Sequence, residues 1–200
     1  MVDVAEGLAV AMTDAEIGVL RECFSKATSL VEFGSGGSTL LAVRSPALRR
    51  IWSVESDPAW IARLRRRQEI VAAEQAGRLA VVRADIGLTG DHGAPDGDAS
   101  RGSWPTYHEE VWNDAATAGA DLVLVDGRFR VACAMAALAH CQAHTILLFH
   151  DFWNRTPYHP VLAFTDWLGS CDSLAILRRK PGIDPVKFEA VRQMYRMNPD

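Results

Sequence analysis

Three ionisable residues follow two apolar stretches in the second half of the chain, and their types suit proton transfer. Asp126 comes directly after the apolar run 121–125, and His150 and Asp151 come directly after the run 145–149. An imidazole or a carboxylate in such a place can take a proton from a hydroxyl or an amine. The same three side chains could instead hold a divalent metal cation that orients two substrate oxygens. We therefore expect Asp126, His150 and Asp151 to be the catalytic residues, and both chemistries stay open.

A glycine-rich stretch near the start of the chain is suited to binding a nucleotide. The sequence LVEFGSGGSTLL covers residues 30–41, where an apolar run ends in a glycine-rich turn and a helix-forming run follows at once. Gly34 and Gly36 let the backbone turn sharply and let a ligand lie against main-chain N–H groups. The free N–H groups of the following helix are expected to face that ligand.

Carboxylates also follow the second and third apolar runs. Glu55 lies 21 residues after Gly34, which is the spacing of a carboxylate that binds both ribose hydroxyls of an adenosine cofactor. The alternative for Glu55 is a solvated acid beside a helix cap. Asp85 follows the run 79–82. Because the carboxyl ends of parallel strands meet at one edge of a sheet, we expect these acids and Asp126 to share one site.

Arginines lie close in sequence to the acids at that edge, at Arg128, Arg130 and Arg155. A guanidinium group binds a carboxylate or a phosphate through two parallel hydrogen bonds. Arg128 and Arg130 are therefore candidate substrate-binding residues. Charge balance against the surrounding acids is the alternative.

The elements that must position these residues alternate between strands and helices. Apolar runs predict strands at 30–34, 51–55, 79–82, 121–126, 145–149 and 174–177. Helices are expected at 13–27, 37–45, 130–141, 158–168 and 184–196, and from Pro58 onward. This alternation predicts an α/β fold: a doubly wound, mostly parallel sheet of six to seven strands with helices on both faces, in three αβα layers.

One long segment, 86–106, interrupts this alternation. It holds five glycines and two prolines, and a structureless loop of about 20 residues is typically a lid or a disordered insertion. Its aromatic far end, 104–108, could anchor a lid. A chain of 200 residues is long enough for one sizeable core. We expect a single domain over 1–200, with a helical extension at 1–27.

Composition and charge exclude several classes of protein. The hydrophobic share of 48% is ordinary for a globular chain, and the net charge of −4 gives no reason to expect a nucleic-acid partner. No apolar run approaches the length of a membrane-spanning helix. The four cysteines form no CxxC pair, and the acidic N-terminus, with Asp3 and Glu6, lacks the basic region of a signal peptide. We expect a cytoplasmic protein, with a homo-oligomer left open.

The ordered motif resembles the class I S-adenosylmethionine-dependent methyltransferases over roughly residues 28–178. The residues that carry the resemblance are Glu32-x-Gly34-x-Gly36-x-Ser38, followed by Glu55, Asp85 and Asp126. The resemblance implies a Rossmann-like methyltransferase fold. It also implies that the glycine loop lies along the methionine part of S-adenosylmethionine, that Glu55 holds the ribose, and that Asp85 lies near the adenine amine. Glu32 matches the family's acid near the amino-acid end of the cofactor.

The chain departs from that family in two places. The segment after the third strand is longer than usual, and the end of the chain lacks an obvious pair of strands for the terminal hairpin. In the catechol-type branch, acids after strands four and five hold a metal. That branch has an Asp-Asn pair where this chain has His150-Asp151, so the match is partial.

The resemblance implies O-methylation of a small-molecule or sugar-containing acceptor. A methyltransferase-like protein that binds S-adenosylmethionine or S-adenosylhomocysteine without catalysis is the alternative. An NAD-dependent oxidoreductase is disfavoured, because Thr39 stands where the dinucleotide loop needs its third glycine.

Overall fold

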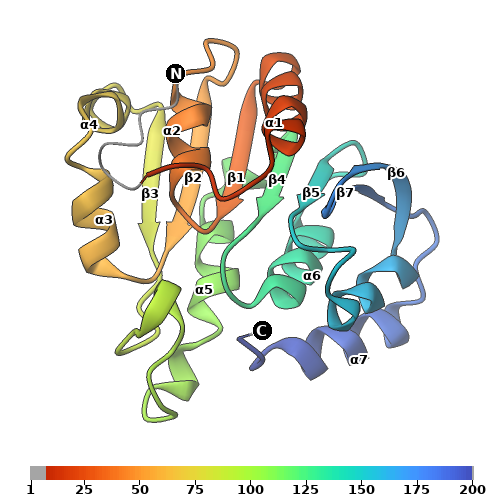
Figure 1. Ribbon diagram of the computed structural model, residues 1–200. Coiled ribbons are helices and arrows are strands. Elements are labelled where there is room, and N and C mark those ends of the chain that lie inside the picture. The colour runs from red at the N-terminus through yellow and green to blue at the C-terminus, as the bar shows by residue number, and fades with distance from the viewer. Residues whose placement is uncertain (1–7, 200) are drawn as a thin grey trace.

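A single mixed sheet organises the computed structural model, which describes residues 8–199 (Figure 1). Within these residues the sheet has seven strands in the order β3-β2-β1-β4-β5-β7-β6. The strands are β1 Ser29–Phe33, β2 Arg50–Glu55, β3 Leu79–Arg83, β4 Leu122–Val125, β5 Ile146–Phe149, β6 Thr165–Cys171 and β7 Leu174–Arg179. Neighbouring strands from β3 to β5 pair in parallel, and β7 pairs antiparallel with both β5 and β6. The predicted doubly wound, mostly parallel sheet is confirmed.

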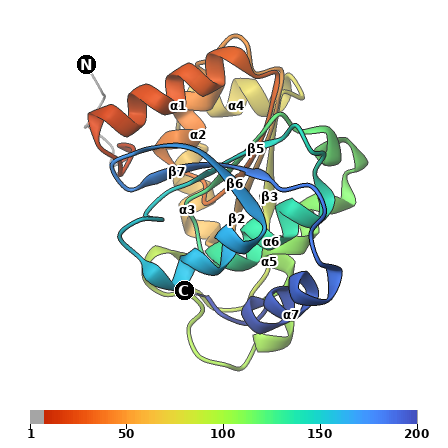
Figure 2. The ribbon, with the colours of Figure 1, turned by 90° about the vertical axis from the view of Figure 1, so that its right-hand side faces the viewer.

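Helices cover both faces of this sheet, as Figure 2 shows. On one side lie α1 Asp14–Lys26, α2 Gly37–Val43 and α4 Gln68–Gln75, and on the other lie α5 Thr106–Glu109, α6 Arg130–His140 and α7 Pro185–Tyr195. The helix expected from Pro58 ends early, as α3 Pro58–Leu64, before α4 begins. No helix within residues 8–199 is long and apolar enough to cross a membrane. Asp3 and Glu6, which bear on the signal-peptide prediction, lie outside the described residues.

The alternation of side chains along the strands divides the core in two. In β4, Leu122 and Leu124 pack with the helices on the α1 side, whereas Val123 and Val125 pack with those on the α6 side. A strand buried on both faces needs apolar residues at every position, which is why β4 reads as a continuous apolar run. Glu32, in β1, breaks this rule, because it is a fully buried carboxylate in the centre of the sheet.

The prediction of a helix at 158–168 was wrong. A 3-10 helix, Thr156–Ala163, occupies its first half, and the edge strand β6 begins at Thr165. Pro157 is tolerated in the first turn, but Pro160 lies inside the helical segment, where it lacks a backbone donor and clashes with the carbonyl four residues earlier. Strands β6 and β7 form the terminal hairpin, for which the sequence showed no obvious pair of strands. Asp172, in its turn, has a left-handed φ of 46°.

The segment 86–106 contains the short 3-10 turns Asp91–Gly93 and Arg101–Ser103 and an isolated bridge between Thr89 and Pro95. Two further 3-10 turns, Glu110–Asn113 and Ala115–Gly119, lead into β4. The strand order reverses between β1 and β4. In open α/β sheets a ligand binds at such a switch point, outside the carboxyl ends of the strands.

Candidate functional site

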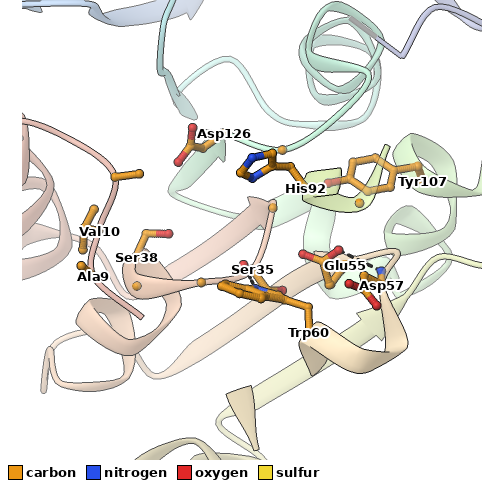
Figure 3. Close-up of a pocket in the computed structure, with 16 residues that line it drawn as sticks. Ala9, Val10, Ser35, Ser38, Glu55, Asp57, Trp60, His92, Tyr107 and Asp126 are labelled. Atoms are coloured by element: carbon orange, nitrogen blue, oxygen red, sulfur yellow. Dashed lines mark hydrogen bonds between the residues drawn. The ribbon is translucent and has the colours of Figure 1, made fainter. Parts of the chain in front are cut away.

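A pocket of about 390 Å³ lies at the carboxyl ends of β1, β2 and β4 (Figure 3). Its walls come from the glycine loop 34–38, from Glu55 at the end of β2, from Asp57 and Trp60 after β2, and from Asp126 and Gly127 after β4. Residues 9–11, His92, Gly93 and Tyr107 complete the lining. The volume is within the ordinary range for small-molecule sites, about 300–1,000 Å³. Of the residues predicted from the sequence, Gly34, Gly36, Ser38, Glu55 and Asp126 line this one pocket.

The glycine loop is shaped by a close approach between two strands' ends. Gly34 has a left-handed φ of 94°, and a Cβ atom there would lie 2.6 Å from Cα of Gly127. A Cβ on Gly127 would in turn lie 2.1 Å from the Tyr107 hydroxyl. The backbones after β1 and β4 can touch only because both residues are glycines.

Thr39, at the position where a dinucleotide loop has its third glycine, ties the loop to the sheet. Its buried hydroxyl accepts a hydrogen bond from the N–H of Gly36 at 2.8 Å and donates to Oε2 of Glu32 at 2.6 Å. The hydroxyl of Ser53 donates to the same oxygen at 2.6 Å. Burial raises the pKa of Glu32 to about 7, although the hydroxyl hydrogen bonds act against this shift. Glu32 therefore lies beneath the loop rather than in the pocket lining.

The first turn of α2 is less accessible than the sequence suggested. A Cβ on Gly37 would lie 2.5 Å from the backbone N of Val10 and 2.6 Å from the carbonyl carbon of Ala9. The N-terminal segment 8–11 therefore packs directly on Gly37 and forms a wall of the pocket. The pocket reaches the loop at Ser35, Gly36 and Ser38 beside this wall.

Glu55 presents one of its two carboxylate oxygens to the protein. Oε1 accepts the N–H groups of Ser56 at 2.7 Å and Asp57 at 3.0 Å. Burial raises the pKa of Glu55, and these two N–H groups oppose the shift. Within residues 8–199, no hydrogen bond reaches Oε2. This geometry leaves an oxygen for two hydroxyl donors of a ligand.

Asp126 lies at the other end of the pocket and is held by a histidine. Nδ1 of His150 lies 2.8 Å from Oδ1 of Asp126, and Nε2 of His150 lies 3.5 Å from Oε2 of Glu16 in α1. Burial acts to lower the pKa of His150, but Asp126, Asp151 and Glu16 together raise it above its usual value. The imidazole thus lies buried between carboxylates that favour its protonated form, and Asp126 is the member of this group that faces the pocket.

Glu16 was not predicted as a site residue, although its capping box with Thr13 was. The carboxylate is buried, and Oε1 accepts the N–H of Ser173 at 2.9 Å and its hydroxyl at 2.7 Å. Burial acts to raise the pKa of Glu16, but the hydrogen bonds of Thr13 and Ser173 and the charge of His150 lower it. Glu16 therefore joins α1 to the β6–β7 turn and to His150. A capping-box glutamate carries no sequence signal for such distant contacts.

Arg130 uses its donors within the protein. Its guanidinium donates to the carbonyls of Gly127 at 3.0 Å, His150 at 2.7 Å and Asp126 at 3.2 Å. It also donates to Oδ2 of Asp151 at 3.2 Å. Arg130 thus clamps the turns after β4 and β5 together, and its predicted contact with a substrate stays untested. Arg128 donates through Nε to the carbonyl of His92 at 3.1 Å.

Asp151 has a left-handed φ of 58° and faces Arg130 and Arg155. Burial acts to raise the pKa of Asp151, but Arg130 and His150 hold it below its usual value. Among residues 8–199, no three His, Cys, Asp or Glu side chains form a group that could hold a metal ion. The carboxylates of Asp126 and Asp151 are instead oriented by Arg130 and His150.

Asp85 is not brought into the pocket lining. Its side chain is 73% exposed, lies 3.9 Å from Arg83, and accepts the N–H of Gly87 at 3.2 Å. Its contact with an adenine amine stays a prediction. His92, Gly93 and Tyr107, which follow Asp85 in the chain, do line the pocket. The aromatic segment 104–108 was the sequence signal for Tyr107, and His92 had none.

Solved structures resemble the chain over most of its length. A methyltransferase-like protein from Silicibacter pomeroyi is 34% identical, with 95% of this chain and 97% of that chain covered and a TM-score of 0.83. An O-methyltransferase from Bacillus cereus in complex with SAH is 14% identical, with coverages of 97% and 73% and a TM-score of 0.50. The SAH-bound Podospora anserina methyltransferase PaMTH1 is 16% identical, with coverages of 82% and 76% and a TM-score of 0.50. The last two show a shared fold. Neither the protein-family models nor the curated proteins include a match.

Proposed function

This chain belongs to the class I methyltransferase family, and on that premise we propose that it transfers a methyl group from S-adenosylmethionine to a hydroxyl of a small-molecule or sugar-containing acceptor. The observation that carries the proposal is the pocket at the β1–β4 switch point. The buried carboxylate of Glu55 lies at one end of it, and the carboxylate of Asp126, in contact with His150, lies at the other.

The residues of the pocket fit S-adenosylmethionine. Glu55 offers Oε2 for the ribose hydroxyls, since only Oε1 is used by the described protein groups. Gly34, Gly36 and Ser38 line the pocket and would lie along the methionine part, where the two glycines leave the loop backbone uncovered by side chains. Glu32 would act at the amino-acid end through Thr39 rather than by contact. When bound, the cofactor supplies a methyl group activated on a sulfonium.

The acceptor end of the site is built around Asp126. Its carboxylate would accept a hydrogen bond from the acceptor hydroxyl and so orient the oxygen for an in-line displacement. Nδ1 of His150 lies 2.8 Å from Oδ1 of that carboxylate and holds it in place. Asp151 acts through Arg130, which fixes the turns that carry Asp126 and His150. Arg128 would bind an anionic acceptor through its Nη groups, which donate no hydrogen bond to a residue within 8–199, since only its Nε is used.

Calorimetry with S-adenosylmethionine and S-adenosylhomocysteine tests the first half of the proposal. We expect both to bind. Incubation with methyl-labelled S-adenosylmethionine and a panel of phenols, catechols and sugar hydroxyls, followed by mass spectrometry, tests the second half. Label transferred to a hydroxyl supports the proposal. Absence of binding removes it, and binding without transfer across the panel favours a cofactor-binding protein that lacks catalysis.

A further inference from the structure

The segment between β3 and α5 forms a fixed wall of the pocket. Its tip is the 3-10 turn Asp91–Gly93, in which the left-handed residues are His92, with φ 55°, and Gly93, with φ 72°. The backbone of Gly90 pairs with that of Ala94 at 2.8 Å. A left-handed conformation is uncommon for a non-glycine residue and persists where the surroundings enforce it.

Two hydrogen bonds hold this tip against both sides of the pocket. The hydroxyl of Ser56, after β2, donates to the carbonyl of Gly93 at 3.0 Å. Nε of Arg128, after β4, donates to the carbonyl of His92 at 3.1 Å. The tip is therefore tied to both strand ends that carry the predicted ligand contacts. The position of His92 follows from the protein's own contacts.

The imidazole of His92 points into the pocket on the side of Asp126 and Tyr107 (Figure 3). Among residues 8–199, no hydrogen bond or ion pair reaches either of its ring nitrogens, and the residue is exposed to solvent. His150 differs, because Asp126 and Glu16 face its two nitrogens and it is buried. His150 thus has a carboxylate beside each ring nitrogen. His92 lines the pocket, and both of its ring nitrogens are left for a ligand by the described residues.

We infer that His92 is a catalytic residue that takes the proton from the acceptor hydroxyl, an assignment that rests on the proposed function. The hydroxyl O–H bond breaks and its proton moves to a ring nitrogen of His92. The oxygen forms a bond to the methyl carbon, the methyl–sulfur bond breaks, and that electron pair stays on sulfur. The products are a methyl ether, S-adenosylhomocysteine and an imidazolium, which loses its proton to solvent because His92 is exposed.

Two substitutions separate proton transfer from a role as a wall of the pocket. His92→Gln keeps a polar side chain, and His92→Phe keeps a flat ring, but neither accepts a proton. We expect both to lower kcat about 100-fold or more, as for the loss of a general base. Affinity for S-adenosylhomocysteine in calorimetry should stay within about threefold of wild type. His144→Gln is the matched control, since His144 is exposed and outside the pocket lining.

Chemical modification gives a readout that does not depend on turnover. Diethyl pyrocarbonate acylates accessible, neutral imidazole nitrogens, and mass spectrometry identifies the modified residues. In the free protein both His92 and His144 should react, and S-adenosylhomocysteine should protect His92 alone. Equal reactivity of His92 with and without saturating S-adenosylhomocysteine would overturn the inference.

The outcomes distinguish this inference from the function on which it rests. If wild type binds no S-adenosylhomocysteine, both the proposed function and the role of His92 are overturned. If wild type binds it but methylates no panel member, the proposed methyl transfer and the role of His92 in it are overturned. Wild-type methylation with unchanged kcat in His92→Gln overturns only the role of His92. Recovery of activity in His92→Phe but not in His92→Gln would also overturn it, because a wall needs only the ring.

Discussion

Nδ1 of His150 lies 2.8 Å from Oδ1 of Asp126, although 24 residues separate them in sequence. The pairing follows from the parallel register of β4 and β5, in which Val125 pairs with Phe149. Each residue directly follows its strand, so the two side chains meet at the sheet edge. A carboxylate that contacts both this imidazole and the guanidinium of Arg130 is held in a fixed orientation.

Asp126→Asn should lower turnover about 100-fold while leaving affinity for S-adenosylhomocysteine within about threefold. The amide keeps the shape of the side chain but loses the charge that orients the acceptor hydroxyl. Steady-state kinetics and calorimetry measure the two effects separately. Asp98→Asn, at an exposed loop position, is the control. Wild-type turnover in Asp126→Asn would contradict the assignment.

Glu55→Ala should weaken binding of S-adenosylhomocysteine by roughly 1–3 kcal/mol, the range for removing a charged hydrogen-bond acceptor. Calorimetry at fixed salt measures this loss. Glu22→Ala removes an exposed glutamate that pairs only with Lys26 among described residues, and it should bind like wild type. Equal affinities for Glu55→Ala and Glu22→Ala would remove the ribose role.

Thr39→Val should destabilise the fold by roughly 1–3 kcal/mol, because it leaves the Gly36 N–H and one hydrogen bond to the buried Glu32 unsatisfied. Thr39→Ser retains the hydroxyl and should lose less. Urea unfolding measures both variants. A serine variant as unstable as the valine variant would show that the methyl group, not the bridge, matters.

Glu32 makes stability depend on pH in an unusual direction. Its folded-state pKa of about 7 lies above the ordinary value of 4.5, so the folded state binds the extra proton between these values. The free energy of unfolding should therefore fall as pH rises from about 4.5 to about 7, by on the order of 3 kcal/mol from this group.

Glu32→Gln should remove this contribution. Urea unfolding of both proteins at pH 5 and pH 8 gives one pH difference for each, and any uniform cost of the amide cancels in that difference. The smaller pH difference is expected for Glu32→Gln. Equal differences would mean that Glu32 keeps an ordinary pKa.

Gly37→Ala should displace the segment 8–11 from the pocket, because the new Cβ would lie 2.5 Å from a backbone nitrogen. Hydrogen exchange at residues 8–13 should become faster, and affinity for S-adenosylhomocysteine should fall. Gly18→Ala is the matched control, since a Cβ there meets nothing within 4 Å. Unchanged exchange in Gly37→Ala would mean that the segment can shift without being released.

The sequence predicts well those features that depend on local pattern and on the geometry of parallel sheets. Glu55 and Asp126 could be assigned to one edge because each directly follows an apolar strand. The capping box of Thr13 and Glu16 is a local signal, and it is present as predicted. The same pattern rules fail at 158–168, where the predicted helix is replaced by a 3-10 helix that contains Pro160 and then by strand β6, whose pairing with β7 is a tertiary contact.

Contacts between distant segments were not predictable in this way. His92 reaches the pocket because Ser56 and Arg128 hold its loop, and no local sequence pattern predicts either contact. Arg130 resembles a substrate-binding arginine until its donors are seen to reach three backbone carbonyls. Side-chain partners of this kind are set by tertiary packing alone.

The contact between Glu16 and Ser173 spans 157 residues, and it has a consequence for biosynthesis. During translation a domain generally folds as a unit, once the segments that it needs have emerged. The carboxylate of Glu16 lacks two of its hydrogen bonds until residue 173 has left the ribosome. The first helix can form early, but the histidine behind the pocket acquires its second carboxylate only when the last hairpin closes. A nascent chain stalled before that hairpin should therefore lack an assembled acceptor end.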